Sequence, residues 1–233
     1  MKDKRLYKKV RRYLLRCIGK GIWLPGQAIP SEFAIAAKTG VSQGTARRAI
    51  AELADEGILK RHQGRGTFVA DAADPAVLQF PFFTDGSPTR FELDCGPCVV
   101  LRGVASPAER AALELKAGAT VLRLYRLRQF KGSPVMSEAI TLPTHIFQAL
   151  KPAQATHAMY DLYQREFGVH VVRMTDRLSA VPADRKLAKQ LGLDIGTPLL
   201  RLERVARAID DSKVELRVNY CHSDNLHYLV RFG

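Results

Sequence analysis

The chain has 233 residues, which is long enough for two domains, and 46% of them are hydrophobic. With a mean hydropathy of −0.12, this composition is typical of a soluble globular protein and excludes a chain made mainly of membrane spans. The charged N-terminal residues are followed by no continuous apolar run. We therefore expect neither a signal peptide nor a membrane segment, and a cytoplasmic location.

The net charge of +13 is unevenly distributed along the chain. Residues 1–70 contain 15 Lys and Arg against 5 Asp and Glu, or +10. A basic surface of this kind binds a polyanion, which could be DNA, RNA or acidic lipid. We favour DNA because the charges accompany a helix-turn-helix pattern with a following hairpin, rather than an amphipathic membrane helix or an aromatic base-stacking strand.

The basic region begins with two predicted helices. Residues 4–19 place apolar side chains on one helical face and Lys and Arg on the other, which predicts the first helix. Residues 22–24 form a short apolar link that we expect to pair with the hairpin, and residues 25–26 form a turn. Ser31 is expected to cap a second helix that ends near Thr39.

A third helix and a hairpin follow. Ser42 suits the N-cap of the third helix, and Gly40 suits a left-handed end of the second one. The apolar stripe of the third helix consists of Ala46, Ala49, Ile50 and Leu53. The opposite side is expected to carry Gln43, Gly44, Thr45, Arg47, Arg48 and Ala51. Residues 58–62 and 66–70 are predicted strands joined by a turn at 63–65, so the order is helix, turn, helix, wing.

This arrangement suits DNA binding. A helix N-terminus offers N–H groups and partial positive charge to a phosphate, and side chains behind it can reach base edges in the major groove. Arg65, between two glycines at the wing tip, can enter the adjacent minor groove. The candidate DNA-binding residues are Ser31, Ser42, Gln43, Thr45, Arg47, Arg48, Arg65 and Gly66. The alternative is an ordinary three-helix domain whose arginines are only solvated charges.

Over roughly residues 4–70 these motifs resemble the winged-helix domain of GntR-family transcriptional regulators. The resemblance rests on Pro25-Gly26, Pro30-Ser31-Glu32, Val41-Ser42, Thr45 to Ile50, Leu53, Glu56-Gly57 and Gly64 to Val69. Two residues depart from the family pattern. Gln43 and Phe33 stand where the family usually has arginine or a similar polar residue, and glutamine favours adenine over guanine.

Residues 71–78 are short, polar and rich in alanine, and we expect them to be a linker. The predicted domains are therefore 1–70, which binds DNA, and 79–233. The second domain contains an internal repeat, because a helix followed by two strands occurs twice, about 75 to 79 residues apart. The first copy has a helix at 107–115 and strands at 121–129 and 134–142, and the second has a helix opening at 182–185 and strands at 199–207 and 214–221.

A further strand precedes each copy, at 90–105 and at 169–180. We therefore predict an α+β domain with six largely antiparallel strands, related by a pseudo-twofold axis, and with helices covering one face. A chance match of two helix-hairpin units is the alternative, because such units are common.

The second domain resembles, over roughly residues 79–230, the effector-binding domain of the HutC subfamily of GntR regulators, which has a chorismate-lyase-like fold. The matching motifs are Arg126-Leu127-Arg128, Gly132 to Val135, Glu138, Leu142-Pro143, Met159 to Leu162, Leu191-Gly192, Gly196 to Leu200 and Val214-Glu215. The resemblance implies that a small effector is sensed here and that DNA binding changes in response.

Arg126 and Arg128 are candidates for effector binding. They alternate with Leu122 and Leu124 on a strand face that would otherwise be buried, where charges need partners. Glu138 on the next strand is a partner for one of them, and an Arg–Glu pair that serves only structure is the alternative. Two arginines and one glutamate leave one positive charge for a small anion, a carboxylate or a phosphate.

The resemblance places both arginines, Glu138 and Glu215 at effector-contacting positions. Tyr160, in the matching motif Met159 to Leu162, is a further candidate for effector binding. The loop at 82–87 is expected to close over the ligand. One departure from related sugar-phosphate sensors is Cys221, which stands where they have a tyrosine six residues after the second glutamate.

Cys95-Gly96-Pro97-Cys98 has the letters of a thioredoxin redox motif. A reactive thiol of that type lies at a helix N-terminus, but here Val99 to Leu101 continue as a strand. Half a zinc site is the second alternative, although no second pair has suitable spacing. We expect a kinked edge segment, because Pro97 cannot donate to a strand ladder.

The sequence thus predicts a ligand-responsive regulator, a repressor that binds an operator as a homodimer, because one winged helix reads few base pairs. We expect no catalytic residues, cofactor or metal. One alternative is an enzyme of chorismate-lyase-like fold fused to a DNA-binding domain. The other is a constitutive architectural DNA binder without a ligand site.

Overall fold

The computed structural model divides the chain into two compact units, which we describe separately. The structure describes residues 2–19, 21–70, 82–84, 93–155, 159–224 and 226–229. The predicted linker at 71–78, and the part of the predicted loop at 85–87, lie outside the described residues. No helix in the part described combines the length and apolar character that crossing a membrane requires.

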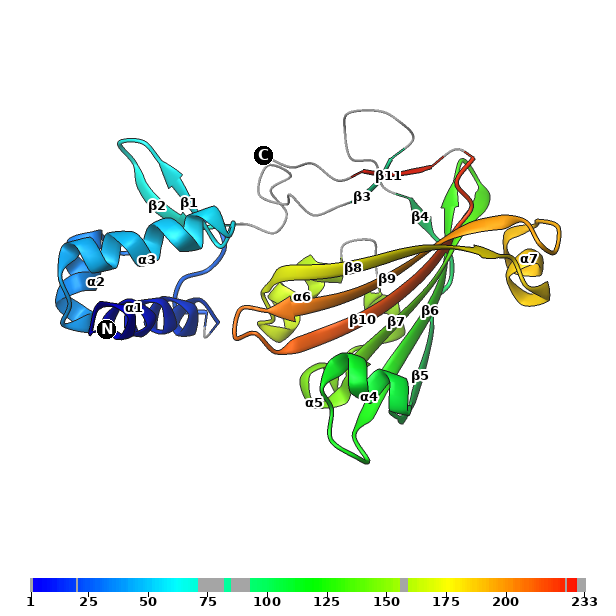
Figure 1. Cartoon of the computed structure of the whole chain (residues 1–233), viewed down its shortest axis with the longest axis horizontal. Helices are drawn as coiled ribbons and strands as arrows, with labels where there is room; N and C mark the ends of the chain where they lie inside the picture. The colour runs from blue at the N-terminus through cyan, green and yellow to red at the C-terminus, as the bar shows by residue number, and fades with distance from the viewer. Residues whose placement is uncertain are drawn as a thin grey trace. The chain divides into compact units, whose positions relative to one another are not determined.

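The first unit has the predicted order of three helices and a hairpin (Figure 1). Its elements are α1 (Lys2–Gly19), α2 (Glu32–Thr39), α3 (Gln43–Asp55), β1 (Leu59–His62) and β2 (Gly66–Val69). Ser31 caps α2 and Gly40 ends it with a left-handed φ of 67°, as predicted. Fully buried apolar side chains from all three helices form the core, including Val10, Leu14, Ile18, Ile35, Ala46, Ile50 and Leu53.

The link between α1 and α2 pairs with the hairpin through residues 26–29, which follow the predicted residues 22–24. Ala28 forms a bridge with Phe68, and backbone bonds join residues 26–29 to 67–69. The apolar residues Ile22 and Leu24 are instead more than half exposed. The pairing begins at Gly26, because the chain reverses at the turn formed by Pro25 and Gly26.

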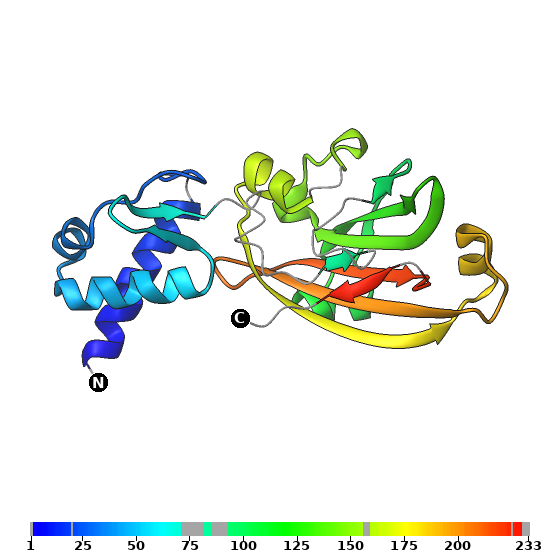
Figure 2. The same ribbon diagram turned by 90° about the horizontal axis from the view of Figure 1, so that it is seen from above.

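The second unit is built on a twisted antiparallel sheet, as Figures 1 and 2 show. Its strands are β4 (Asp94–Cys95), β5 (Val99–Val104), β6 (Thr120–Phe130), β7 (Ser133–Pro143), β8 (Val171–Pro182), β9 (Pro198–Ala208) and β10 (Lys213–Cys221). They follow the order β4-β6-β7-β10-β9-β8, with β5 also pairing with β6. The central pair, β7 and β10, joins the two predicted repeats antiparallel.

Among the described residues the sheet has seven strands and not six. The predicted strand at 90–105 is split into β4 and β5. Cys95 pairs with Arg128 and Val99 with Tyr125, so the three residues 96–98 lie opposite only two residues of β6, 126–127. Gly96 keeps one backbone bond to Leu127 across this interruption. The segment is thus a kink at the sheet edge, as expected for Pro97.

The helices that follow along the chain are α4 (Pro107–Leu113), α5 (Thr144–Phe147), α6 (Met159–Phe167) and α7 (Arg185–Leu191), with a short 3-10 turn at Pro152–Gln154. The division into units falls within α6, so that residues up to Leu162 belong to the second unit and residues 163–172 to the first. Ser106 and Glu109 form the predicted capping box at the start of α4. The prediction that the helices cover one face of the sheet is wrong, because they contact both faces. Residues of α4 and α7 contact the face that carries Arg123 and Ser137, whereas Tyr160 of α6 contacts Glu215 on the opposite face.

A two-stranded ribbon, absent from the sequence-based prediction, packs on the second unit. It consists of β3 (Phe82–Thr84) and β11 (His227–Leu229), which pair antiparallel (Figure 1). Beside it, Met136 and Cys221 of the sheet form a small core with Leu93 and Leu226. These apolar residues cover one end of the sheet face on which the charged candidates lie.

Candidate functional site

The start of α3 is fixed by its N-cap. The Thr45 N–H donates to Ser42 Oγ at 3.3 Å, and the hydroxyls of the same two residues are 2.9 Å apart. Thr45 is therefore buried and turned back onto the cap, whereas we predicted it on the outward side. Gln43, Gly44 and Arg47 are exposed as predicted. The helix thus offers a short polar surface at its N-terminal end.

Two arginines of α3 have described partners. Arg47 Nε donates to Glu32 Oε2 at 2.8 Å, while its side chain is 63% exposed. Exposed pairs of this kind contribute at most about 1 kcal/mol, so Glu32 can release Arg47 to another acceptor. The Arg48 guanidinium instead lies 5.4 Å from the centroid of the Tyr7 ring on α1. Both arginines remain exposed on the surface of the helix.

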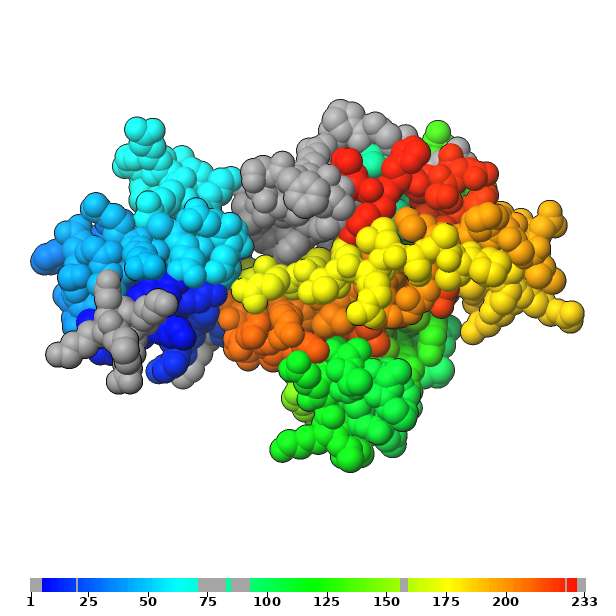
Figure 3. Space-filling view, viewed as in Figure 1, coloured from blue at the N-terminus to red at the C-terminus, as the bar shows by residue number. Residues whose placement is uncertain are grey.

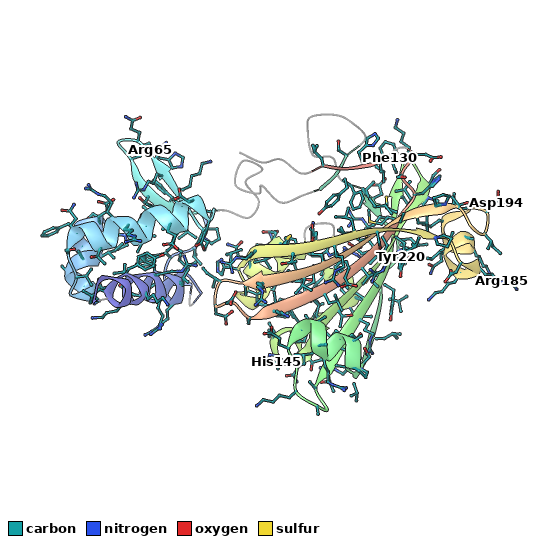
Figure 4. The ribbon with its side chains drawn as sticks, viewed as in Figure 1. Arg65, Phe130, His145, Arg185, Asp194 and Tyr220 are labelled. Atoms are coloured by element: carbon teal, nitrogen blue, oxygen red, sulfur yellow. The ribbon has the colours of Figure 1, made fainter. Side chains whose placement is uncertain are left out.

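The wing presents Arg65 at its tip. The turn between β1 and β2 needs Gly64 and Gly66, which have φ values of 73° and 113°. Arg65 is exposed and points away from the first unit in Figure 4, and the hairpin, cyan in Figure 3, stands out from its surface. Ser31 lies at the start of α2, where its hydroxyl accepts from the Ala34 N–H at 3.2 Å.

A buried charge network lies on one face of the sheet in the second unit. It consists of Arg126, Arg128, Glu138, Glu215 and Arg217. Arg126 lies opposite Glu138 in the β6–β7 register, and its Nε donates to Glu138 Oε2 at 2.7 Å. Arg128 Nη1 is 3.8 Å from the same oxygen. The predicted pairing of Glu138 with one of the two arginines is therefore present, and Arg126 is the closer partner.

Sequence reasoning missed Arg217, which joins the two glutamates. Its Nη1 donates to Glu138 Oε1 at 2.9 Å, and its Nε and Nη2 donate to the two oxygens of Glu215 at 2.9 and 2.8 Å. The signal was present in the alternation of Glu215, Arg217 and Asn219 along β10, which puts three polar side chains on a buried face.

Tyr160 of α6 closes one side of the network. Its hydroxyl donates to Glu215 Oε1 at 2.8 Å, and its ring centroid is 5.2 Å from Arg217 Cζ. Burial, and next the charge of Glu215, raises the pKa of Tyr160. The tyrosine is thus a neutral hydrogen-bond donor at any ordinary pH.

The charges of the network determine how Glu138 titrates. Burial acts to raise the pKa of Glu138, but Arg217, Arg126 and Arg128 together lower it from 4.5 to about 2. Glu138 is only 3% exposed and is nevertheless ionised at neutral pH. A buried carboxylate is tolerated here because both of its oxygens accept hydrogen bonds from guanidinium groups.

A second ion pair extends the polar face toward the β3–β11 ribbon. Arg204, opposite Arg217 in the β9–β10 register, donates twice to Asp176 of β8, at 2.7 Å each. The hydroxyl of Tyr228 on β11 donates to Asp176 and lies 3.2 Å from Arg204 Nη2. Burial is the largest cause that raises the pKa of Tyr228. The ribbon is thus anchored to the sheet by a side-chain bond.

The two cysteines of the kinked segment are free thiols. Burial raises the pKa of Cys98, and the charge of Arg126 offsets this only in part. No group of three metal-ligating side chains occurs among the residues that the structure describes. A protonated thiol is a weak nucleophile, so Cys98 is not activated. Cys95 lies in strand β4, opposite Arg128, and not at a helix N-terminus.

Comparison with known proteins identifies both parts of the chain. Residues 6–69 match the family described as bacterial regulatory proteins, gntR family, and residues 99–227 match the UTRA domain. A probable fructoselysine utilization operon transcriptional repressor from Escherichia coli is 27% identical over 223 residues, which cover 95% of this chain and 92% of that protein. The regulator GgaR from the same organism is 27% identical over 220 residues, which cover 94% of this chain and 88% of GgaR.

Solved structures agree with this assignment. The ligand-binding domain of a GntR-family regulator from Bordetella bronchiseptica is 29% identical, with a TM-score of 0.58, and covers 63% of this chain and 94% of that one. PhnF from Mycobacterium smegmatis is 25% identical, with a TM-score of 0.53, and the match covers 96% of this chain and 99% of PhnF. The chain therefore belongs to the GntR family, in its HutC-type group with a UTRA domain, and is a ligand-responsive, DNA-binding transcriptional regulator.

Proposed function

We propose that the UTRA domain senses a small anionic molecule, a carboxylate or a phosphate, on the face that carries the buried charge network. The observation that supports this is the burial of Arg126 and Arg128, which are 2% and 9% exposed and lie side by side on one face of β6. Apolar residues would suit this face better if it served only stability, because burying ions is costly.

In this proposal Arg126 and Arg128 bind the anionic group, because guanidinium groups match carboxylate and phosphate oxygens. Glu138, Tyr160 and Glu215 hydrogen-bond to neutral hydroxyl or N–H groups elsewhere on the ligand. We further propose that the protein releases the ligand chemically unchanged. Nuclear magnetic resonance spectra of the ligand, recorded before and after a long incubation with the protein, would check this.

A thermal-shift screen of the full-length protein with carboxylates and phosphorylated sugars tests the proposal. A ligand at a hundredfold its Kd stabilises the domain that binds it by about 2.7 kcal/mol. Arg126→Ala should abolish the response to a hit and leave DNA affinity without ligand within a factor of a few. Arg185→Ala, an exposed arginine of α7, is the matched control. A hit that stabilises Arg126→Ala as much as the wild type would contradict the proposal.

For DNA, we propose that Gln43 and Arg47 contact base edges in the major groove and that Arg65 enters the minor groove. Ser31, Ser42, Arg48 and Gly66 would contact or position the phosphate backbone. We also propose a homodimer, because two winged helices read a two-fold symmetric operator with double the contact of one. Light scattering of the purified protein gives its mass, and a mass of 25.9 kDa at micromolar concentration would contradict the dimer.

A further inference from the structure

Arg217 occupies the space between the two glutamates proposed to contact the effector. Its three guanidinium nitrogens all donate to those carboxylates, at distances of 2.8 to 2.9 Å. The side chain is 11% exposed, and the ring of Tyr160 lies against it. This arrangement fixes a permanent internal cation beside Glu138 and Glu215.

The consequence concerns which ligand groups the glutamates can accept. A neutral hydroxyl or amide N–H can share a remaining lone pair of a carboxylate that already accepts from arginine. An ammonium group placed there would lie beside Arg217, and also near Arg126, which donates to the other oxygen of Glu138. Like charges at close range in a buried site repel strongly, and such repulsion is a usual source of specificity.

We propose that Arg217 determines the specificity of the effector site: it selects anions whose remaining polar groups are neutral hydroxyl or amide groups, and it excludes those that carry an ammonium group. The inference rests on the proposed effector site and adds the class of ligand that the site takes. Arg217 does so through its positive charge, which its bonds to the two glutamates hold beside them.

The test measures a selectivity ratio in the full-length protein. Isothermal titration gives the Kd for three matched pairs, in which a hydroxyl is replaced by an ammonium: glycerate and serine, hydroxyethyl phosphate and phosphoethanolamine, and glucose and glucosamine phosphorylated on the terminal carbon. In the pairs that bind, we expect the wild type to prefer the hydroxyl member at least about tenfold. Arg217→Gln should reduce this preference to about threefold or less, or reverse it.

Three further variants separate specificity from folding. Arg217→Lys keeps the positive charge and should keep the preference. Glu215→Gln combined with Arg217→Gln removes one charge of each sign, so it should fold if Arg217→Gln does not, and it should also lose the preference. Arg201→Gln removes an arginine from β9 that pairs with Glu203 on the opposite face, and it should change nothing in the ratio.

A purely structural role for Arg217 would weaken both members of each pair equally and leave their ratio unchanged. That result, or a wild type that prefers the ammonium members, would overturn the inference while leaving the anion site intact. If inorganic phosphate and all six compounds fail to bind the wild type, the proposed anion site fails, and the inference falls with it.

Discussion

Replacing Glu138 by Gln should destabilise the UTRA domain through the loss of one buried charge. The pKa of Glu138 is lowered from 4.5 to about 2, against the effect of burial, by Arg217, Arg126 and Arg128. Because one pKa unit corresponds to about 1.4 kcal/mol, the carboxylate contributes roughly 3 kcal/mol, which agrees with the roughly 3 to 5 kcal/mol lost when one partner of a buried pair is removed.

The sign of the pH dependence follows from the direction of this shift. A group whose pKa is lower in the folded state stabilises it at pH values above the unfolded pKa. The difference between wild type and Glu138→Gln should therefore be complete at neutral pH. It should disappear as the pH falls from about 4.5 toward 2.

Urea unfolding, followed by two probes, measures the effect. Trp23, the only tryptophan of the chain, lies in the first unit, so its fluorescence reports that unit, whereas circular dichroism of the sheet reports the second. Only the second transition should move. Glu114→Gln, which removes an exposed partner of Lys213, is the control and should move neither. A change below about 1 kcal/mol, or one that persists at low pH, would refute the argument.

Three other changes test single features. Ser42→Ala should cost about 1 kcal/mol of stability in the first unit, read from Trp23 fluorescence, because the cap of α3 is lost; no change would mean that the cap is not needed. Arg47→Ala should cost roughly 1 to 3 kcal/mol on the specific operator by fluorescence anisotropy, but little on random DNA; equal losses on both would exclude a base contact. Replacing Cys95 and Cys98 together by Ser should leave operator affinity and ligand response unchanged, since burial raises the pKa of Cys98 and Cys95 lies in a strand without a helix N-terminus beside it; loss of either would show a role for the pair.

Local rules predicted those features that depend on neighbours in sequence. The caps of α2, α3 and α4 follow from Ser31, Ser42 and Ser106, because each hydroxyl accepts from a backbone N–H three residues on. A pair between Glu138 and one of the two arginines follows from strand alternation in a predicted hairpin, and the register makes that arginine Arg126. Features of this kind need only periodicity and turn chemistry, and both can be read from the chain.

Features that depend on distant segments were missed. Arg217 lies 79 residues from Glu138, and only the β7–β10 pairing brings them together. One local feature was also missed: Thr45 fits either side of α3 by spacing, and its bond to Ser42, three residues away, decides the choice. The β3–β11 ribbon joins segments near opposite ends of the second unit, and such short strands carry too little pattern to predict.

Selection from a random duplex DNA library by the full-length protein tests the central claim most directly. The account predicts enrichment of one two-fold symmetric sequence. Binding should weaken steeply with salt, with a slope near −0.9 in log K against log salt for each phosphate that the protein neutralises. Arg47→Ala should relax the preference at one base pair of each half-site. Enrichment of no sequence by the wild type would contradict the assignment of α3 and the wing as a sequence-reading surface.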